Sequence, residues 1–220
     1  GHIINPQGYI TELMKIFYHN GGKFINAKVK DFGFHNEKIH VVFTDNGKFE
    51  CDKVVITAGI WSKNLMRKLG LKIPLEAERG YHVVYKNASI LPRNPMMMTV
   101  GKFGVTPMKG DLRCAGTVEL GGIKIGPSQG PIKLLRRRVA EAFPKMTYDK
   151  TEEWLGFRPT APDSLPLIGQ LKESGVYTAF GHQHIGMTSG PKTGRLISDI
   201  INYRSPNINM SFYDPNRFNS

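Results

Sequence analysis

An arginine held among prolines is the side chain best suited to bind a carboxylate. Arg158 lies in the segment Gly156–Gly169, which reads GFRPTAPDSLPLIG and contains three prolines that fix the backbone around it. A rigidly held guanidinium can bind a carboxylate through two parallel hydrogen bonds. The alternative to carboxylate binding is that Arg158 forms a structural ion pair with Asp163 or Glu153.

A second segment that could form part of a functional site is Val54–Ser62, which reads VVITAGIWS. A continuous β-branched run that ends on small residues is typical of a strand buried on both faces of an α/β sheet. Small residues at its carboxyl end let a ligand approach closely, at the edge where open α/β sheets bind ligands. The alternative is a tight strand-to-helix turn without a ligand.

A third segment, Gly181–Gly194, reads GHQHIGMTSGPKTG and predicts a turn from a strand into a helix. Free N–H groups at such a helix start favour a negative ligand edge. His182 and His184 could face the same way as metal ligands, but no third ligand is nearby, so we favour packed or hydrogen-bonded histidines and expect no metal. The chain has no GxGxxG, GxxxxGK[ST] or GxSxG motif, so it contains no complete dinucleotide fingerprint, P-loop or nucleophile elbow.

Composition narrows the class of protein. The chain has 220 residues, 40% of them hydrophobic and 22% charged, which is typical of a globular protein. The longest clean apolar run, Val54–Ala58, is far shorter than the roughly 18 to 20 residues of a membrane span. Two cysteines, Cys51 and Cys114, without a CxxC motif, exclude a disulfide framework and a four-cysteine zinc site. We therefore expect a reducing compartment, the cytoplasm.

Charge raises the question of an anionic partner. Thirty Lys and Arg against 18 Asp and Glu give a net charge of +12, so nucleic acid and an anionic membrane surface must be considered. The cations are mostly dispersed, and the densest run is Arg136–Arg138. No zinc-finger, RNP or basic-zipper pattern accompanies them, so we expect no nucleic acid.

Helical and strand patterns alternate over the first 72 residues. Asn5-Pro6 and the apolar spacing from Tyr9 to Phe17 predict a helix that ends at Asn20-Gly21-Gly22. A second helix follows Gly59, with apolar residues at four-residue spacing. The predicted strands are Phe24–Asn26, Lys30–Phe34, Ile39–Thr44, Lys48–Cys51 and Val54–Gly59, with a turn at Asp45–Gly47.

From Ile73 the pattern changes to strands separated by Pro and Gly, which predicts an antiparallel sheet. The predicted strands are Ala77–Tyr85, Met96–Val100, Phe103–Met108 and Arg113–Glu119, with Met96–Met98 as core filling. An amphipathic helix from Ile132 to Phe143 follows. After a proline-punctuated stretch from Trp154 to Gly169 come a strand at Val176–Phe180 and a final helix after Gly186.

In this order, the segments resemble the FAD-dependent D-amino acid oxidase superfamily, most closely its D-amino acid dehydrogenase branch. The matching features are Asn5-Pro6, Ala27–Val29, Val54–Ser62, Glu78–His82, Gly156–Gly169 and Gly181–Thr188. The resemblance implies a mixed α+β and α/β fold: part of a FAD-binding Rossmann-like domain plus an antiparallel-sheet substrate domain. It assigns residues 1–72 and 151–220 to the first and 73–150 to the second.

The resemblance also implies roles for single residues. Val29 would meet the adenine end of FAD, Arg158 would hold the substrate carboxylate, and Tyr81 and His82 would border the substrate pocket. His184 stands where relatives such as glycine oxidase have an arginine, and is a fourth candidate beside the substrate. The other expected cofactor contacts are Ala58, Gly59 and Trp61 along FAD, and Gly181, His182, Gly186, Met187 and Thr188 around the isoalloxazine ring.

The implied reaction is oxidative deamination of a D-amino acid to a 2-oxo acid and ammonia, with FAD as cofactor. We hypothesise re-oxidation by a membrane electron acceptor, such as a quinone at the inner face of the cell membrane, toward which Arg136–Arg138 could orient the protein; the alternative for these arginines is a solvated face. Other functions left open are oxidation of glycine, sarcosine or D-hydroxyproline, and a basic binding module without catalysis. Because the family's glycine-rich phosphate loop is absent, we expect this chain to be a C-terminal portion that is inactive and free of FAD by itself.

Overall fold

The computed structural model describes residues 3–218, which divide into two compact units. Of these, residues 3–25 together with Arg79–Gly156 form the first unit, and Asn26–Glu78 together with residues 157–218 form the second. The chain passes between the units within strands β5 (Glu76–Tyr85) and β9 (Thr151–Thr160). The cofactor and substrate roles assigned to segments 1–72, 73–150 and 151–220 remain predictions.

Helix α1 (Pro6–His19) confirms the first predicted helix. The Asn5 side chain caps it by accepting a 2.9 Å hydrogen bond from the Gly8 N–H, and Pro6 occupies its first turn. The chain leaves the helix through Gly21, whose φ of +84° suits glycine. None of the helix residues is buried.

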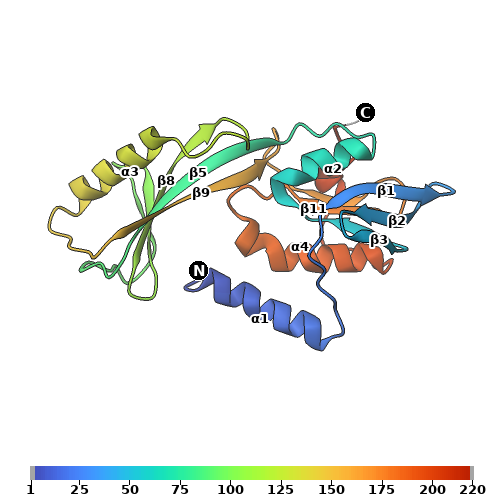
Figure 1. Ribbon diagram of the computed structural model, residues 1–220, viewed down its shortest axis with the longest axis horizontal. Helices are drawn as coiled ribbons and strands as arrows, with labels where there is room; N and C mark the ends of the chain where they lie inside the picture. The colour runs from blue at the N-terminus through green and yellow to red at the C-terminus, as the bar shows by residue number, and fades with distance from the viewer. Residues whose placement is uncertain (1–2, 219–220) are drawn as a thin grey trace. The chain divides into compact units, whose positions relative to one another are not determined.

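The rest of the first unit is a five-stranded sheet with a helix packed against it. The strand order is β6–β7–β8–β5–β9, with β6 at Met96–Met98, β7 at Phe103–Pro107 and β8 at Leu112–Leu120. The pairs β6–β7 and β7–β8 are antiparallel, as predicted. Helix α3 (Gln129–Ala142) lies along β8 (Figure 1) and buries Ile132, Leu135 and Val139 in the core that β5, β7 and β8 share.

Two sequence predictions in these regions were wrong. Phe24–Asn26 forms no strand. Met96 and Met97 do not fill the core, because β6 is an edge strand and leaves them 44% and 69% exposed. The proline-punctuated stretch from Trp154 to Gly169, for which no strand was named, contains the second half of β9 and the start of β10.

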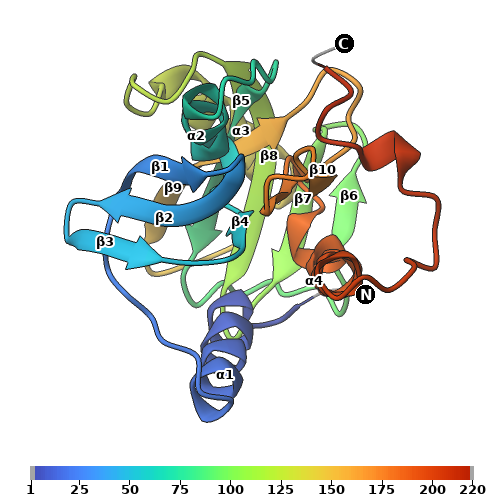
Figure 2. The ribbon, with the colours of Figure 1, turned by 90° about the vertical axis from the view of Figure 1, so that its right-hand side faces the viewer.

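The second unit holds two three-stranded sheets. Strands β1 (Val29–His35), β2 (Lys38–Thr44) and β3 (Gly47–Glu50) form an antiparallel meander in that order (Figure 2), with the predicted turn before Gly47. The other sheet has the order β10–β11–β4, from β10 (Leu167–Gln170), β11 (Val176–Phe180) and β4 (Val54–Ile56). Strand β11 pairs parallel with β4 and antiparallel with β10.

Helices complete the second unit. The short helix η1 (Gly59–Trp61) and α2 (Ser62–Lys68) follow β4, α4 (Gly186–Ile201) follows β11, and η2 (Ser211–Tyr213) lies near the end of the chain. Helix α4 packs Leu196 and Ile197 against Ile168 and Tyr177 of β10 and β11. No helix among residues 3–218 has the length and apolar character to cross a membrane.

Strand β4 is buried on one face only, so the prediction of a strand buried on both faces was wrong. Ile56 is 3% exposed, whereas Val55 is 36% exposed. Val55 is the register partner of Tyr177, and α4 packs over β10 and β11 rather than over the edge strand β4. The Val55 side chain therefore lacks the cover that Tyr177 receives.

Candidate functional site

Two of the three segments singled out in the sequence meet at one edge of a sheet. Strands β4 and β11 are parallel, with Thr178 opposite Ile56, so their carboxyl ends lie side by side. The turn at Gly59 follows one strand and the turn at Gly181 follows the other, with φ angles of +54° and +91° that favour glycine. This is the edge where open α/β sheets bind ligands.

The arginine segment reaches the same edge. The Gln183 N–H donates a 3.2 Å hydrogen bond to the carbonyl oxygen of Pro159, which joins the end of β9 to the turn after β11. The rings of Trp61 and Phe157 meet edge-on, with centroids 6.3 Å apart and an interplanar angle of 82°. Arg158 is therefore held between contacts to the turns after both β4 and β11.

Arg158 and its neighbour Thr160 have polar atoms without partners. Nη1 of Arg158 and Oγ1 of Thr160 are buried, and neither makes a hydrogen bond within residues 3–218. The two residues are two positions apart on β9, so their side chains lie on the same face. Leaving a buried donor unpaired costs about 1 to 3 kcal/mol, so these atoms are suited to a partner from outside the chain.

The structural alternative for Arg158 is not seen. Asp163 pairs instead with Arg217, through contacts of 2.7 and 3.1 Å, and this pairing holds the pKa of the Asp163 carboxyl below its usual value. Glu153 pairs with Arg136 at 2.8 Å. Both acids that the sequence offered as partners are thus already engaged.

The start of α4 presents its positive end without a side-chain cap. Its first turn contains no acid, and the hydroxyls of Thr188 and Ser189 both donate to the Ile185 carbonyl oxygen. Gly186 is half-buried, while Met187 and Thr188 are exposed. The helix dipole favours negative charge at this position.

The two histidines of the turn differ in their surroundings. His182 is half-buried, and its Nε2 shares a 2.9 Å hydrogen bond with Oγ1 of Thr193, which ties the turn to α4. Burial lowers the pKa of His182, so the ring is neutral near pH 7. His184 is exposed. Within residues 3–218 no group of three His, Cys, Asp or Glu side chains is arranged to hold a metal ion.

A pocket of about 710 Å³ adjoins the turn after β4. It brings together Val29, Ala58 and Trp61, three of the residues expected along the cofactor, while Gly59 lies between the last two in the chain. Its volume falls in the range of roughly 300 to 1,000 Å³ that ligand pockets occupy. The other lining residues are Ala27, Lys28, Lys30, Asn64, Leu65 and Lys68.

Most of these lining residues were not predicted from the sequence. Leu65 belongs to the apolar residues at four-residue spacing in the predicted second helix, and Lys28, Lys30 and Lys68 were not singled out. The available signal was the spacing of Trp61, Leu65 and Lys68, which puts them on one helix face. An aromatic and aliphatic wall with three lysines and no acid fits an aromatic group attached to phosphates, which is the chemistry of the adenosine end of FAD.

Tyr81 lies in the first unit, in a partly buried polar network. Its side chain is 1% exposed, its hydroxyl donates to Oε2 of Glu119 at 2.6 Å, and it accepts from the Ser128 N–H at 3.1 Å. Arg79, also 1% exposed, donates through Nη2 to the Gly126 carbonyl oxygen, and its Nε lies 3.3 Å from the Glu119 carboxylate. Contact between Tyr81 and substrate remains a prediction.

His82, also in the first unit, is held on two sides. Its ring stacks on Trp154 with centroids 4.9 Å apart, and Nε of Arg113 donates to its Nδ1 at 3.2 Å. Because Nδ1 accepts, Nε2 carries the proton and is the donor that remains. Burial, with the charge of Arg113 as a second cause, lowers the pKa of His82 to about 4.

We therefore expect His82 to stay neutral well below the pH at which a free histidine gains its proton. An NMR titration of the imidazole carbon protons should give a pKa near 4. Replacing Arg113 with Gln should raise that value, since one of its two causes is removed. A pKa near the ordinary 6.5 in the unchanged protein would contradict this environment.

The chain is similar to several curated proteins. It is 34% identical to a D-amino-acid oxidase from Bradyrhizobium diazoefficiens, over 99% of this chain and 53% of that protein. It is 31% identical to a D-amino acid dehydrogenase from Vibrio vulnificus, over 88% and 47%, and 30% identical to a glycine oxidase from Pseudomonas aeruginosa, over 81% and 50%. The chain thus spans about half the length of these curated relatives.

Solved structures show the same fold. Glycine oxidase from Geobacillus kaustophilus superposes with a TM-score of 0.76 at 24% identity, covering 87% of this chain and 52% of that one. L-proline dehydrogenase from P. horikoshii superposes with a TM-score of 0.83 at 22% identity, covering 96% and 59%. The expectation of a mixed α/β fold with antiparallel sheets is confirmed.

The comparison with protein families agrees with the relatives and with the fold. The family described as "DAO: FAD dependent oxidoreductase" matches residues 1–200 of the 220. The resemblance seen in the sequence is therefore confirmed, and the chain belongs to the DAO family of FAD-dependent oxidoreductases.

Proposed function

We propose that the full-length gene product oxidises the amine-bearing carbon of a small D-amino acid, giving a 2-oxo acid and ammonia. The observation that carries the proposal is the buried, unpartnered Nη1 of Arg158 beside the turns after β4 and β11. A group that binds carboxylates in a fixed orientation is what an amino acid substrate requires. The names of the relatives, D-amino-acid oxidase and D-amino acid dehydrogenase, support the substrate class.

The second unit supplies residues that fit FAD. Val29, Ala58 and Trp61 would hold its adenosine end in the 710 Å³ pocket, and the turn from Gly181 to Thr188 would border its ring system. Bound FAD supplies a two-electron acceptor. The uncapped start of α4 favours negative charge beside it, and the neutral ring of His182 keeps the turn attached to the helix.

Arg158 would bind the carboxylate of the substrate and so fix the position of the substrate's α-carbon. The amine must be neutral, and its proton passes to water, so no dedicated general base is needed. Overall, the amino acid loses two electrons and two protons and becomes an imino acid. Water then adds to the imine carbon, ammonia leaves, and a 2-oxo acid remains.

The direct test is a visible absorption spectrum of the full-length gene product under anaerobic conditions. We expect a yellow protein that bleaches with D-alanine or D-proline and not with the L-enantiomers. Bleaching by glycine or sarcosine would favour the second candidate, a glycine-oxidising enzyme, which the glycine oxidase relative supports. A protein that never carries flavin would contradict both candidates and favour the basic binding module.

The electron acceptor can be tested with the same preparation. We propose a quinone, and expect faster re-oxidation by a soluble quinone than by air. Arg136 and Arg137 each face an acid, Glu153 at 2.8 Å and Glu141 at 3.8 Å, which favours a solvated face over membrane contact. Unchanged liposome binding after replacement of all three arginines of Arg136–Arg138 with serine would remove the membrane role.

Trp61 gives a test of the cofactor pocket. Replacing Trp61 with alanine should weaken flavin binding about tenfold, because a large aromatic side chain of the pocket wall is lost. The measurement is the flavin fraction retained after dialysis. Trp154→Ala is a matched control, since Trp154 is 55% exposed against 54% for Trp61 and does not line the pocket. Equal retention by the two variants would contradict the assignment.

A further inference from the structure

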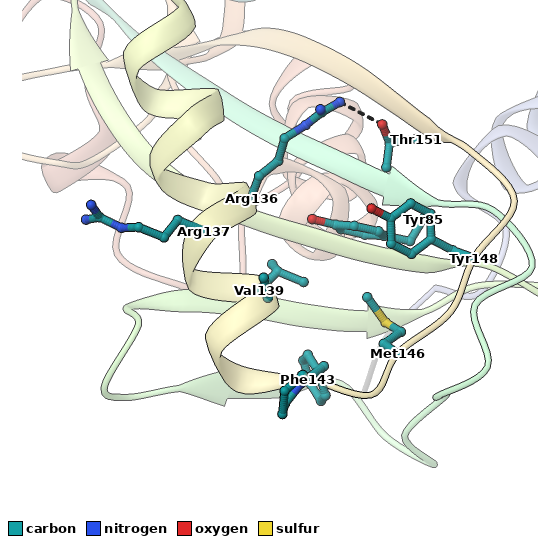
Figure 3. A pocket seen from close by; sticks show the side chains of 10 residues that line it. Tyr85, Arg136, Arg137, Val139, Phe143, Met146, Tyr148 and Thr151 are labelled. Atoms are coloured by element: carbon teal, nitrogen blue, oxygen red, sulfur yellow. Dashed lines mark hydrogen bonds between the residues drawn. The ribbon is translucent and has the colours of Figure 1, made fainter.

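The first unit contains a pocket that shares no residue with the candidate site. Its volume is about 430 Å³, and it lies between α3 and the segment that connects α3 to β9 (Figure 3). This volume is within the range of roughly 300 to 1,000 Å³ in which small-molecule sites fall. The proposed reaction makes no use of this pocket.

The wall of this pocket, here called the α3 pocket, is part apolar and part cationic. Val139, Phe143, Met146 and Tyr148 provide aliphatic, aromatic and thioether surface. The polar lining residues are Tyr85, Arg136, Arg137 and Thr151, and no acid lines the pocket. An apolar wall with a few convergent polar groups is the usual composition of a ligand site.

Tyr85 is the most informative of these residues. Tyr85 is 3% exposed, and its hydroxyl makes no hydrogen bond within the described residues 3–218. The ring meets Tyr148 edge-on at 4.8 Å, and Figure 3 shows both rings pointing toward α3. Burial raises the pKa of Tyr85 to about 12, so its hydroxyl stays protonated and can donate. The hydroxyl oxygen is not among the fully buried atoms that lack a partner, so it reaches the open space of the pocket, where it can donate to a bound molecule.

The two arginines make the α3 pocket suitable for an anion. Nη2 of Arg136 donates to Oγ1 of Thr151 at 2.6 Å and contacts Glu153 at 2.8 Å, which fixes its position and leaves its other donors unused by those contacts. Arg137 lies 3.8 Å from Glu141 in a pair whose side chains are 69% and 67% exposed. Figure 3 shows the Arg137 side chain extending away from Tyr85, but such an exposed pair is weak, so Arg137 can turn toward a ligand in the pocket.

We propose that the α3 pocket binds a small aromatic carboxylate. The ring of the ligand would pack among Val139, Phe143 and Met146, where thioether and aromatic contacts are favourable. Its carboxylate would accept hydrogen bonds from the Tyr85 hydroxyl and the Arg137 guanidinium. The ligand's one anionic group is matched to the guanidinium of Arg137, because Nη2 of Arg136 already contacts Thr151 and Glu153.

The test uses the full-length gene product and 3-phenylpropionate as the probe, measured by isothermal titration calorimetry. We expect saturable binding of one molecule at the α3 pocket and about tenfold weaker binding of 3-phenylpropanamide, which lacks the charge. Tyr85→Phe keeps the ring and should weaken binding about fivefold, and Arg137→Gln about tenfold. Arg138→Gln is the matched control, because Arg138 is the next residue of α3 and does not line the pocket.

An Arg158→Ala variant separates the α3 pocket from the candidate site, which also binds carboxylates under the proposed function. Binding that persists in Arg158→Ala and weakens in Tyr85→Phe and Arg137→Gln supports the proposal. Binding that disappears in Arg158→Ala and is unchanged in the other two variants overturns it. Absence of any binding at about 10 mM probe also overturns it.

Discussion

Replacing Arg158 with lysine in the full-length gene product should raise the KM for the amino acid substrate about a hundredfold. The lysine keeps the positive charge but loses the planar fork that holds a carboxylate through two parallel bonds. A charge-assisted hydrogen bond contributes about 1.5 to 3 kcal/mol, and about 1.4 kcal/mol is a factor of ten. Because Arg158 would orient the α-carbon, kcat should also fall, and Arg158→Ala should lower kcat/KM further than Arg158→Lys.

The design separates substrate binding from folding. Flavin content and unfolding midpoint should match the unchanged protein, since Nη1 of Arg158 makes no hydrogen bond within residues 3–218. Arg195→Lys is the control: it makes the same substitution in the same unit, at a side chain that is 70% exposed. A KM that stays the same in Arg158→Lys would remove Arg158 from substrate binding while leaving the FAD assignment intact.

Local patterns predicted most helices and strands correctly. Asn5, Pro6 and the apolar spacing of α1 predicted the first helix, and the positions of Ile132, Leu135 and Val139 predicted the buried face of α3. These features depend on neighbours a few residues away, so they can be read from a short window.

Strand β9 shows where such reading fails. The stretch from Trp154 to Gly169 was described only as punctuated by proline, which cannot donate to a sheet ladder, and no strand was named in it. The strand order places β9 at the edge of its sheet, where one side of the strand needs no partner and proline is tolerated. Edge position is a property of the whole sheet, and the same property explains the exposed Met96 and Met97 of β6.

The sequence predicted the segments of the candidate site separately, but not that they lie together in the fold. The sequence indicated Arg158, the turn after β4 and the turn after β11, but not that they meet. That meeting depends on the parallel pairing of Ile56 with Thr178 and on the hydrogen bond from Gln183 to Pro159, both between segments distant in sequence. No local pattern specifies either contact.

A second large effect is expected for Arg79, whose buried side chain holds the loop before α3. Replacing Arg79 with methionine should lower the free energy of unfolding by about 1 to 2 kcal/mol, because the side chain that is lost is 1% exposed and donates a charge-assisted hydrogen bond to the Gly126 carbonyl oxygen. The change removes the donor to the Gly126 carbonyl oxygen and the cation beside Glu119. Urea unfolding of the full-length gene product should show a lower midpoint with an unchanged slope.

The pH dependence tests the same network independently. Hydrogen bonds from Tyr81 and Ser128, with the charge of Arg79 as a smaller cause, hold the pKa of Glu119 below its ordinary value. A carboxyl with a lowered pKa stabilises the fold above its ordinary pKa, and this stabilisation is lost as the pH falls through its value in the folded protein. The difference between the unchanged protein and Arg79→Met should therefore shrink in acid. Lys133→Met, at an exposed position of α3, is the control and should change stability little; a loss equal to that of Arg79→Met would show that the Arg79 side chain does not hold this loop.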